Sequence, residues 1–124
     1  KKIDEIRISR QLTCQRYYEA LSGLDWIEAP CNDFATVNPF LYYIRVLNGK
    51  RTELRDYMKD KGVDTGIHWQ AGHSFTYFKD CYRGPLDVTD KITKEIVSLP
   101  LHSRMMSESV ERVINAIRSF SINI

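Results

Sequence analysis

The stretch from residue 40 to residue 47 has the alternation that a β-strand with one buried face requires. The side chains predicted to share one face are Tyr42, Ile44 and Val46, with Tyr43 and Arg45 on the other. Asn48-Gly49 follows directly and favours a turn. Because such a strand buries one face, it has to be covered by another layer of structure.

Four segments have helical spacing of their apolar residues and could supply that layer: residues 1–21, 51–61, 89–97 and 107–120. Ser107 is predicted to cap the last helix, and Gly62 to end the second in the left-handed conformation. The clearest apolar stripe is that of the last helix, with Val110, Val113, Ile114, Ile117 and Phe120. A second short strand is predicted over residues 63–69, a loop over 25–38 and an extended segment over 98–101. This order predicts an α+β fold with a few strands covered by helices.

The 124 residues suffice for one domain, and their net charge of +2 comes from scattered basic residues, which argues against nucleic acid. No apolar run is long enough to span a membrane, and no signal peptide is visible. The chain opens at Lys1 directly into a helical pattern, as expected of a piece of something longer, although a processed or tagged full-length protein would look similar. The three cysteines, Cys14, Cys31 and Cys81, are odd in number and widely spaced. This favours a reducing cytoplasm and predicts that each cysteine fills space rather than reacts.

The stretch GIHWQAGHSF, residues 66–75, holds His68 and His73. A metal site is not favoured, because the two histidines are five residues apart and no further ligand stands at a known spacing. A serine nucleophile is not favoured either, since Ser74 adjoins His73 directly and no G-x-S-x-G sequence is present. His73 follows glycine in a predicted loop, so we expect it to face a ligand. For His68, a core position and a ligand contact both stay open.

Two longer runs resemble the C-terminal part of the DegT/StrS-type aminotransferases: YYIRVLNGKRTELRDYMKDKGVDTGIHWQAGH and VSLPLHSRMMSESVERVINAI. In that family a strand ending in an Ile-Arg-Val-like triplet leads into a helix closed by Lys-Gly. A second strand then carries Thr-Gly-x-His and an aromatic residue, here residues 65–69, and a second histidine follows, here His73. The family's Ser-Leu-Pro-Leu turn appears at residues 98–101. The first helix matches the spacing of the family's long interdomain helix at Arg10, Tyr17 and Leu21.

The resemblance implies the small C-terminal domain of a fold-type-I enzyme dependent on pyridoxal 5'-phosphate (PLP), with a largely antiparallel sheet covered by helices. Residues 1–22 would be the connecting helix and residues 23–124 the small domain. The full-length enzyme would be a cytoplasmic homodimer that transfers an amino group from glutamate to a keto sugar of a nucleotide sugar. Its Schiff-base lysine and cofactor site would lie in a large N-terminal domain. No catalytic or cofactor-binding residue is therefore expected in this chain, which alone would be inactive and bind no PLP.

The implied substrate contacts lie in the histidine loop. His73 would help hold the substrate near the cofactor, Trp69 and Gln70 would shape the entrance, and His68 would support the loop from its strand. The chain departs from the family pattern at three places. Phe40 stands where histidine is common, Trp69 where tyrosine or phenylalanine is common, and Ala71-Gly72 where proline is common. These departures leave the sugar accepted undefined.

Two other interpretations stay open. The chain could be a stand-alone sugar-nucleotide-binding or interaction module that uses the His73 loop, since it is long enough for a core of its own. It could also come from a related fold-type-I enzyme acting on an amino acid, with Arg45 or Arg83 binding the substrate carboxylate. An isolated small domain should expose apolar surface on its first helix, so we expect self-association there.

Overall fold

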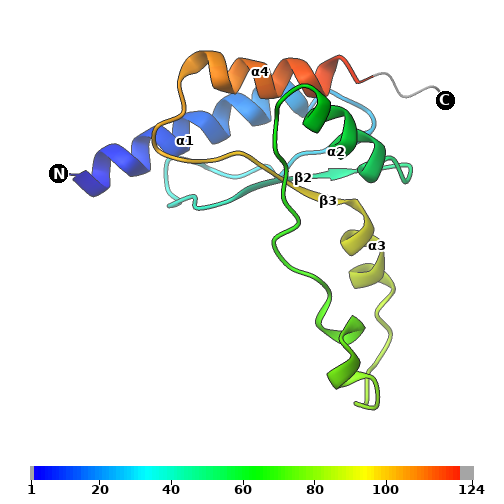
Figure 1. The fold of residues 1–124 in the computed structure, drawn as a ribbon. Helices are drawn as coiled ribbons and strands as arrows, with labels where there is room; N and C mark the ends of the chain where they lie inside the picture. The colour runs from blue at the N-terminus through cyan, green and yellow to red at the C-terminus, as the bar shows by residue number, and fades with distance from the viewer. Residues whose placement is uncertain (1, 121–124) are drawn as a thin grey trace.

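The centre of the fold is an antiparallel sheet with three strands among the described residues. The computed structural model describes residues 2–120, and Figure 1 shows the central strands below the two long helices. The strand order is β1 (Ile27–Glu28), β2 (Tyr42–Val46) and β3 (Ile96–Leu99), so β2 is central. The predicted alternation is confirmed, because the buried side chains of β2 are Tyr42, Ile44 and Val46, whereas Tyr43 is exposed.

Three helices form a second layer on the sheet: α1 (Lys2–Leu21), α2 (Arg51–Asp60) and α4 (Ser107–Arg118). The Tyr17 ring of α1 packs on the Tyr42 ring of β2 with 5.3 Å between centroids. Tyr17 Oη also donates a hydrogen bond of 2.9 Å to the carbonyl of Pro100. The predicted stripe of α4 faces the core, with Val110, Val113, Ile114 and Ile117 buried and Phe120 half-buried. The expected α+β class is confirmed.

The two turns predicted from asparagine and glycine form as expected. Asn48 has a φ of 59° and Gly49 a φ of 72°, and together they connect β2 to α2. Gly62 has a φ of 74° directly after α2. Left-handed backbone of this kind is costly for most residues but open to glycine and tolerated by asparagine. The local sequence alone therefore predicts both the turn between β2 and α2 and the end of α2.

The prediction for residues 63–69 is wrong. Only Gly66 pairs with the sheet, through an isolated bridge to Ser98, and the chain then leaves the sheet. The predicted helix over 89–97 is also shifted, because α3 runs from Asp87 to Glu95 and residues 96–99 form β3. Ile96 and Val97 are β-branched, and pairing with β2 outweighs continuing the helix.

Two smaller corrections concern the ends of elements. The predicted loop over residues 25–38 contains the two-residue strand β1, in which Ile27 pairs with Val46. Met106 is the N-cap of α4, so Ser107 is the first helical residue rather than the cap. The Ser107 hydroxyl accepts a hydrogen bond of 3.1 Å from Arg16 Nη1, which ties α4 to α1 instead of capping the helix.

The first helix is divided along its length. The helix predicted from Lys1 is confirmed from Lys2 onwards, and Lys1 lies outside the described residues. Three apolar side chains within residues 2–12 are exposed, namely Ile3, Ile8 and Leu12, while Ile6 is half-buried. Its buried residues come later, namely Thr13, Cys14, Tyr17 and Leu21. Within residues 2–120 no helix combines the length and apolar character needed to cross a bilayer.

The three cysteines are all free. Cys14 is fully buried in the core, and burial raises the pKa of its thiol to about 11. Cys31 and Cys81 are exposed, so the prediction that each cysteine fills space is wrong for these two. Only Cys14 has the environment of a packing residue.

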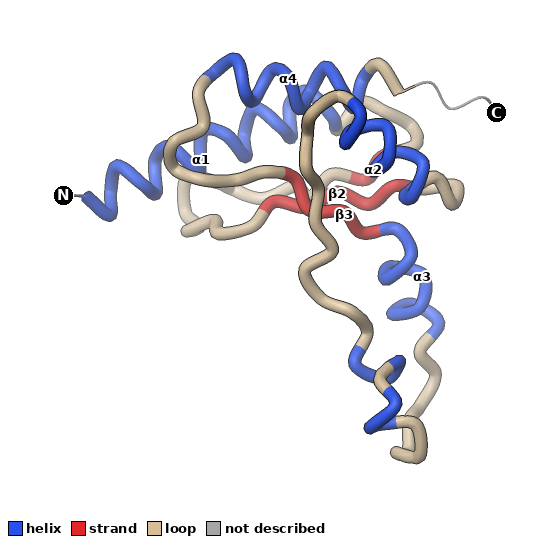
Figure 2. Tube along the Cα trace, in the orientation of Figure 1, coloured by secondary structure: helices blue, strands red, loops and turns tan. Residues whose placement is uncertain are grey.

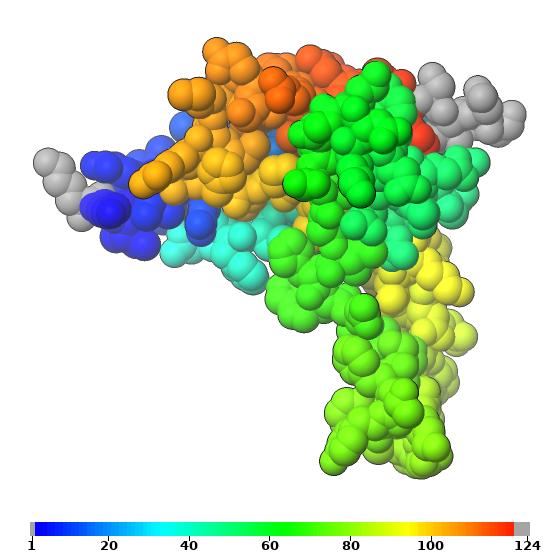
Figure 3. Space-filling model, in the orientation of Figure 1, coloured from blue at the N-terminus to red at the C-terminus, as the bar shows by residue number. Residues whose placement is uncertain are grey.

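Residues 69–86 form an arm that projects away from the helices and sheet (Figures 2 and 3). It contains two short 3-10 turns, Gly72–Ser74 and Thr76–Phe78, and returns to the sheet through α3. Arg83 links parts of the arm by donating hydrogen bonds to three of its backbone carbonyls. The acceptors are His73 at 3.2 Å, Phe78 at 3.2 Å and Lys79 at 2.8 Å.

Candidate functional site

Three segments that are distant in sequence meet at a surface hollow of about 280 Å³. We call it the His68 hollow. The residues that line it are Phe40, Leu41, Asp64, Thr65, Gly66, His68, Ser98, Leu99, Pro100 and Leu101. Most of these belong to the sequence motifs identified above, so the fold gathers the motifs at one place.

Backbone pairing explains why these segments meet. Gly66 N donates to the Ser98 carbonyl at 3.0 Å, and Ser98 N donates to the Gly66 carbonyl at 2.8 Å. Arg55 of α2 holds the adjoining Thr65, donating to its hydroxyl at 3.1 Å and to its carbonyl at 3.2 Å. The pairing of Tyr42 with Leu99 then places the residues just before β2 beside the end of β3. The floor of the hollow is therefore held by main-chain bonds.

Gly66 gives His68 room to fold back over the backbone. A Cβ atom at Gly66 would lie 2.9 Å from His68 Cε1 and 3.1 Å from its Nδ1. Real Cβ atoms essentially never show the shorter of these contacts, and the longer is unusually tight, so a side chain at position 66 would displace the imidazole. His68 thus occupies an exposed position beside the hollow. Of the two interpretations that the sequence left open for it, the core position is excluded.

Trp69 stands next to this imidazole, with 5.9 Å between the two ring centroids. Its indole also meets the Phe40 ring edge to face, at 6.5 Å and 77°. Both aromatic side chains remain largely solvent-exposed, Trp69 by 65% and Phe40 by 70%. Gln70 follows at the root of the arm and is exposed as well.

His73 lies apart from the His68 hollow and does not line it. Its Nε2 donates a hydrogen bond of 2.7 Å to Asp90 Oδ1, which links the arm to α3. The hydroxyl of the neighbouring Ser74 donates to the Ala71 carbonyl at 2.6 Å. His73 is thus partnered to a carboxylate and Ser74 to the main chain, an arrangement that does not make a nucleophile–base pair. Substrate contact by His73 remains a prediction.

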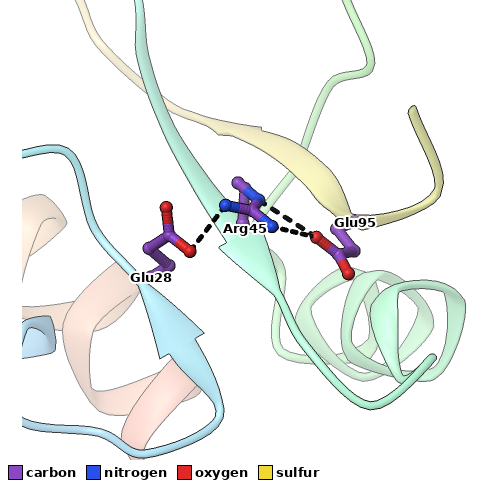
Figure 4. Close-up of polar contacts among 3 residues, drawn as sticks. All are labelled: Glu28, Arg45 and Glu95. Atoms are coloured by element: carbon purple, nitrogen blue, oxygen red, sulfur yellow. Dashed lines mark hydrogen bonds and ion pairs between the residues drawn. The ribbon is translucent and has the colours of Figure 1, made fainter. Parts of the chain in front are cut away.

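Within the described residues there is neither a metal-binding cluster nor an unengaged Arg45. Among residues 2–120 no group of three or more histidine, cysteine, aspartate or glutamate side chains could hold a metal ion. Arg45 is engaged on both sides (Figure 4), donating to Glu95 Oε2 at 2.7 and 3.0 Å and to Glu28 Oε2 at 2.6 Å. The hydrogen bonds to Glu95 are the largest cause of a raised pKa for Arg45.

The residues at the hollow that the sequence did not single out are Leu41 and Asp64. Asp64 directly precedes the Thr-Gly-x-His motif, which could have suggested its place beside His68. Ser98 begins the Ser-Leu-Pro-Leu turn, but only the bridge to Gly66 places it at the site.

Comparison with known proteins gives a consistent result. The model of the DegT/DnrJ/EryC1/StrS aminotransferase family matches residues 1–118. The aminotransferase TlmJ from Streptoalloteichus hindustanus is similar in structure, with a TM-score of 0.84 and 24% identity over 95% of this chain and 32% of its own. Sugar aminotransferase CalS13 from Micromonospora echinospora has a TM-score of 0.84 and 18% identity over 94% of this chain and 31% of its own.

NtdA from Bacillus subtilis, solved with bound cofactor PMP, has a TM-score of 0.79 and 25% identity over 91% of this chain and 28% of its own. The likenesses to TlmJ and CalS13, below 25% identity, show the fold. In each comparison the chain spans about a third of the length of the solved protein.

Proposed function

The chain belongs to the DegT/DnrJ/EryC1/StrS aminotransferase family, and from this we propose that it is the C-terminal part of a PLP-dependent sugar aminotransferase. The reaction we propose transfers an amino group from glutamate to a keto sugar carried on a nucleotide. The observation that carries the proposal is the family match over residues 1–118. The fold shared with sugar aminotransferase CalS13 and with PMP-bound NtdA supports it.

We assign residues 1–22 to the helix that connects to a large N-terminal domain, and residues 23–124 to the small domain. The division of α1 supports this, because its first half exposes apolar side chains such as Ile8 and Leu12 while Tyr17 and Leu21 are buried. We place the full-length enzyme in the cytoplasm as a homodimer. Free cysteines, two of them exposed, suit a reducing compartment.

Neither the hollow that contains Lys91 and Lys94 nor the His68 hollow has the groups expected of a PLP site. Such a site needs a lysine for the Schiff base and groups that hold the ring and phosphate. The hollow that contains Lys91 and Lys94 is otherwise lined by Gly49, Asp87, Asp90 and Glu95, without an aromatic ring. The His68 hollow contains no lysine. We therefore assign cofactor binding and the catalytic lysine to the large domain, and propose that this chain alone is inactive.

The work of this chain would be to position the substrate. His68 offers an imidazole beside the hollow, and Trp69 and Gln70 stand at its entrance. His73 would act from the arm, where its bond to Asp90 sets the orientation of its ring. These are roles in binding and orientation, while the bound cofactor supplies the amino-transfer chemistry.

The amino-acid enzyme is disfavoured by the arginines. Arg45 is held between two carboxylates, and Arg83 donates to three carbonyls inside the arm. Arg45 is already engaged by carboxylates, and both terminal nitrogens of Arg83 are engaged by the main chain, which does not favour either as a bidentate site for a substrate carboxylate.

The test is the visible absorption spectrum of the full-length protein, recorded before and after glutamate is added. We expect the band of the aldehyde form of the cofactor to be replaced by that of the amine form, and a nucleotide-linked keto sugar to restore it. A protein that takes up no cofactor would refute the proposal and favour the stand-alone binding module. A full-length chain in which no lysine-bearing domain precedes residue 1 would have the same consequence.

A further inference from the structure

Two exposed aromatic rings form a wall beside the His68 hollow. Phe40 lines the hollow directly, and Trp69 contacts both Phe40 and His68. Leaving such large apolar surfaces next to each other in water is unfavourable, and such patches commonly mark binding sites. Phe40 and Trp69 come from opposite sides of β2 in the sequence, 29 positions apart, so local packing along the chain does not explain their contact.

Three polar side chains at the same hollow have no partner within the described part of the chain. Asp64, His68 and Ser98 make no side-chain hydrogen bond or ion pair among residues 2–120. Ser98 is only 4% exposed as a residue, but its hydroxyl is not one of the buried unpartnered groups and it lines the hollow, so a ligand there could reach it. Thr65 differs, because its hydroxyl is already bonded to Arg55.

We propose that the His68 hollow, with the Phe40–Trp69 wall, is a subsite for one sugar ring. This inference rests on the proposed function and identifies the ring as the keto sugar of the nucleotide sugar. The aromatic wall would contact the C–H face of the ring. The carboxylate of Asp64, the imidazole of His68 and the hydroxyl of Ser98 would bond its hydroxyl groups.

Size and charge favour the sugar over the rest of the nucleotide. At about 280 Å³ the hollow lies just below the range of about 300–1,000 Å³ that holds a drug-sized ligand, so it suits a single ring. Asp64 offers only acceptors, which match hydroxyl donors and repel a diphosphate. The two aromatic rings meet at 77°, so they form a corner rather than the parallel slot that would enclose a flat base.

The test uses the full-length protein and calorimetric titration, which needs no turnover. The variants are Phe40→Ala and Trp69→Ala, and the matched control is Tyr82→Ala, which removes a 99% exposed aromatic ring of the arm that does not line the hollow. We expect each of the first two variants to weaken binding of the nucleotide sugar at least tenfold. Binding of the corresponding nucleoside diphosphate should change less than twofold, and Tyr82→Ala should change neither.

Each alternative result has a separate meaning. Equal weakening of nucleotide sugar and nucleoside diphosphate would show that the wall binds the base, and would overturn the subsite. Unchanged binding in both wall variants would overturn it as well. The spectroscopic test with glutamate reports on the proposed function independently. An enzyme that transaminates but keeps its sugar affinity without the wall would refute only the subsite.

A second substitution guards against a folding defect. Asp64→Asn keeps the size of the side chain at an exposed position and changes only its charge and one acceptor. We expect it to weaken the nucleotide sugar more than the nucleoside diphosphate. If Asp64→Asn instead bound the nucleoside diphosphate more tightly, with an unchanged ratio between its affinities for the nucleotide sugar and the diphosphate, the phosphates would lie in the hollow. That result would overturn the assignment.

Discussion

Replacing Arg45 by methionine should destabilise the chain more than any other single loss of charge around it. Arg45 lies between Glu95 and Glu28 on the face of β2 opposite the core (Figure 4). The side chains of Arg45 and Glu95 are 17% and 12% exposed, whereas Glu28 is 58% exposed. Removing Arg45 therefore leaves a nearly buried carboxylate without its partner.

The magnitude follows from these exposures. Removing one partner of a buried ion pair costs about 3–5 kcal/mol, and the residual exposure here places Arg45→Met at the lower end, about 3 kcal/mol. The exposed pair with Glu28 contributes about 0–1 kcal/mol, so Glu28→Gln should cost less than about 1 kcal/mol. In the double variant Arg45→Met, Glu95→Met no buried charge remains unpaired, since only the exposed Glu28 loses its partner, and the cost should fall below that of Arg45→Met alone.

Urea unfolding, followed by tryptophan fluorescence in a Trp69→Phe background so that Trp26 is the reporter, measures these differences. Trp26 packs against Phe120 at 5.6 Å and reports on the core. For Arg45→Met we expect the midpoint to fall by more than about 1 M, given slopes of about 1–3 kcal/mol/M. A loss below about 1 kcal/mol, or a double variant that costs the sum of the single changes, would refute the reasoning from burial.

Three further predictions address other parts of the chain. Gly66→Ala should move the His68 ring, visible in its NMR shifts, at a cost below about 1 kcal/mol because the ring can rotate away; an unmoved ring would contradict the contact. Burial raises the pKa of Cys14 from 9.0 to about 11, so the unfolded chain loses this proton first. The contribution of Cys14 to the free energy of unfolding should be fully present below pH 9 and should fall by about 2–3 kcal/mol between pH 9 and 11. Over this pH range the urea midpoint should fall less steeply with pH for Cys14→Ala than for the wild-type chain, and an equal dependence on pH would refute this. Finally, the chain should self-associate through the exposed half of α1. Leu12→Lys should make it monomeric by light scattering with a stability change within about 0.5 kcal/mol; wild-type protein that stays monomeric at all concentrations would contradict this.

Sequence patterns sufficed where structure is determined locally. The alternation in β2, the stripe of α4 and the turns at Gly49 and Gly62 depend on neighbouring residues and were predictable. Sequence patterns were insufficient where a strand is defined by pairing with residues distant in the sequence. The strand expected over residues 63–69 had suitable side chains, but its backbone finds a partner only at Ser98. The strand β1, with two residues, is defined by Val46 and Arg45 rather than by its own sequence.

The candidate site shows the same limit. The family motifs placed His68 and His73 in one loop, whereas the fold gives them different surroundings. The partner of His73 is Asp90, seventeen positions away on α3, and nothing in the loop sequence indicates it. Phe40 and Trp69 were each recognisable as departures from the family pattern, but only the fold shows that their rings touch.

The His68 hollow draws its residues from parts of the fold that are held in different ways. Ser98 is fixed by strand pairing and by its bridge to Gly66. Trp69 instead begins the arm, whose other end returns to the sheet through α3. Polar contacts hold α3, from Arg51 to the Thr93 carbonyl and from Arg45 to Glu95. Because no residue of the arm belongs to the apolar core, we infer that these polar contacts set its direction, and with it the position of Trp69 against the main-chain-bonded floor. β3 and the segment bridged to it at Gly66 supply the polar groups of the proposed subsite, and the arm supplies half of its aromatic wall.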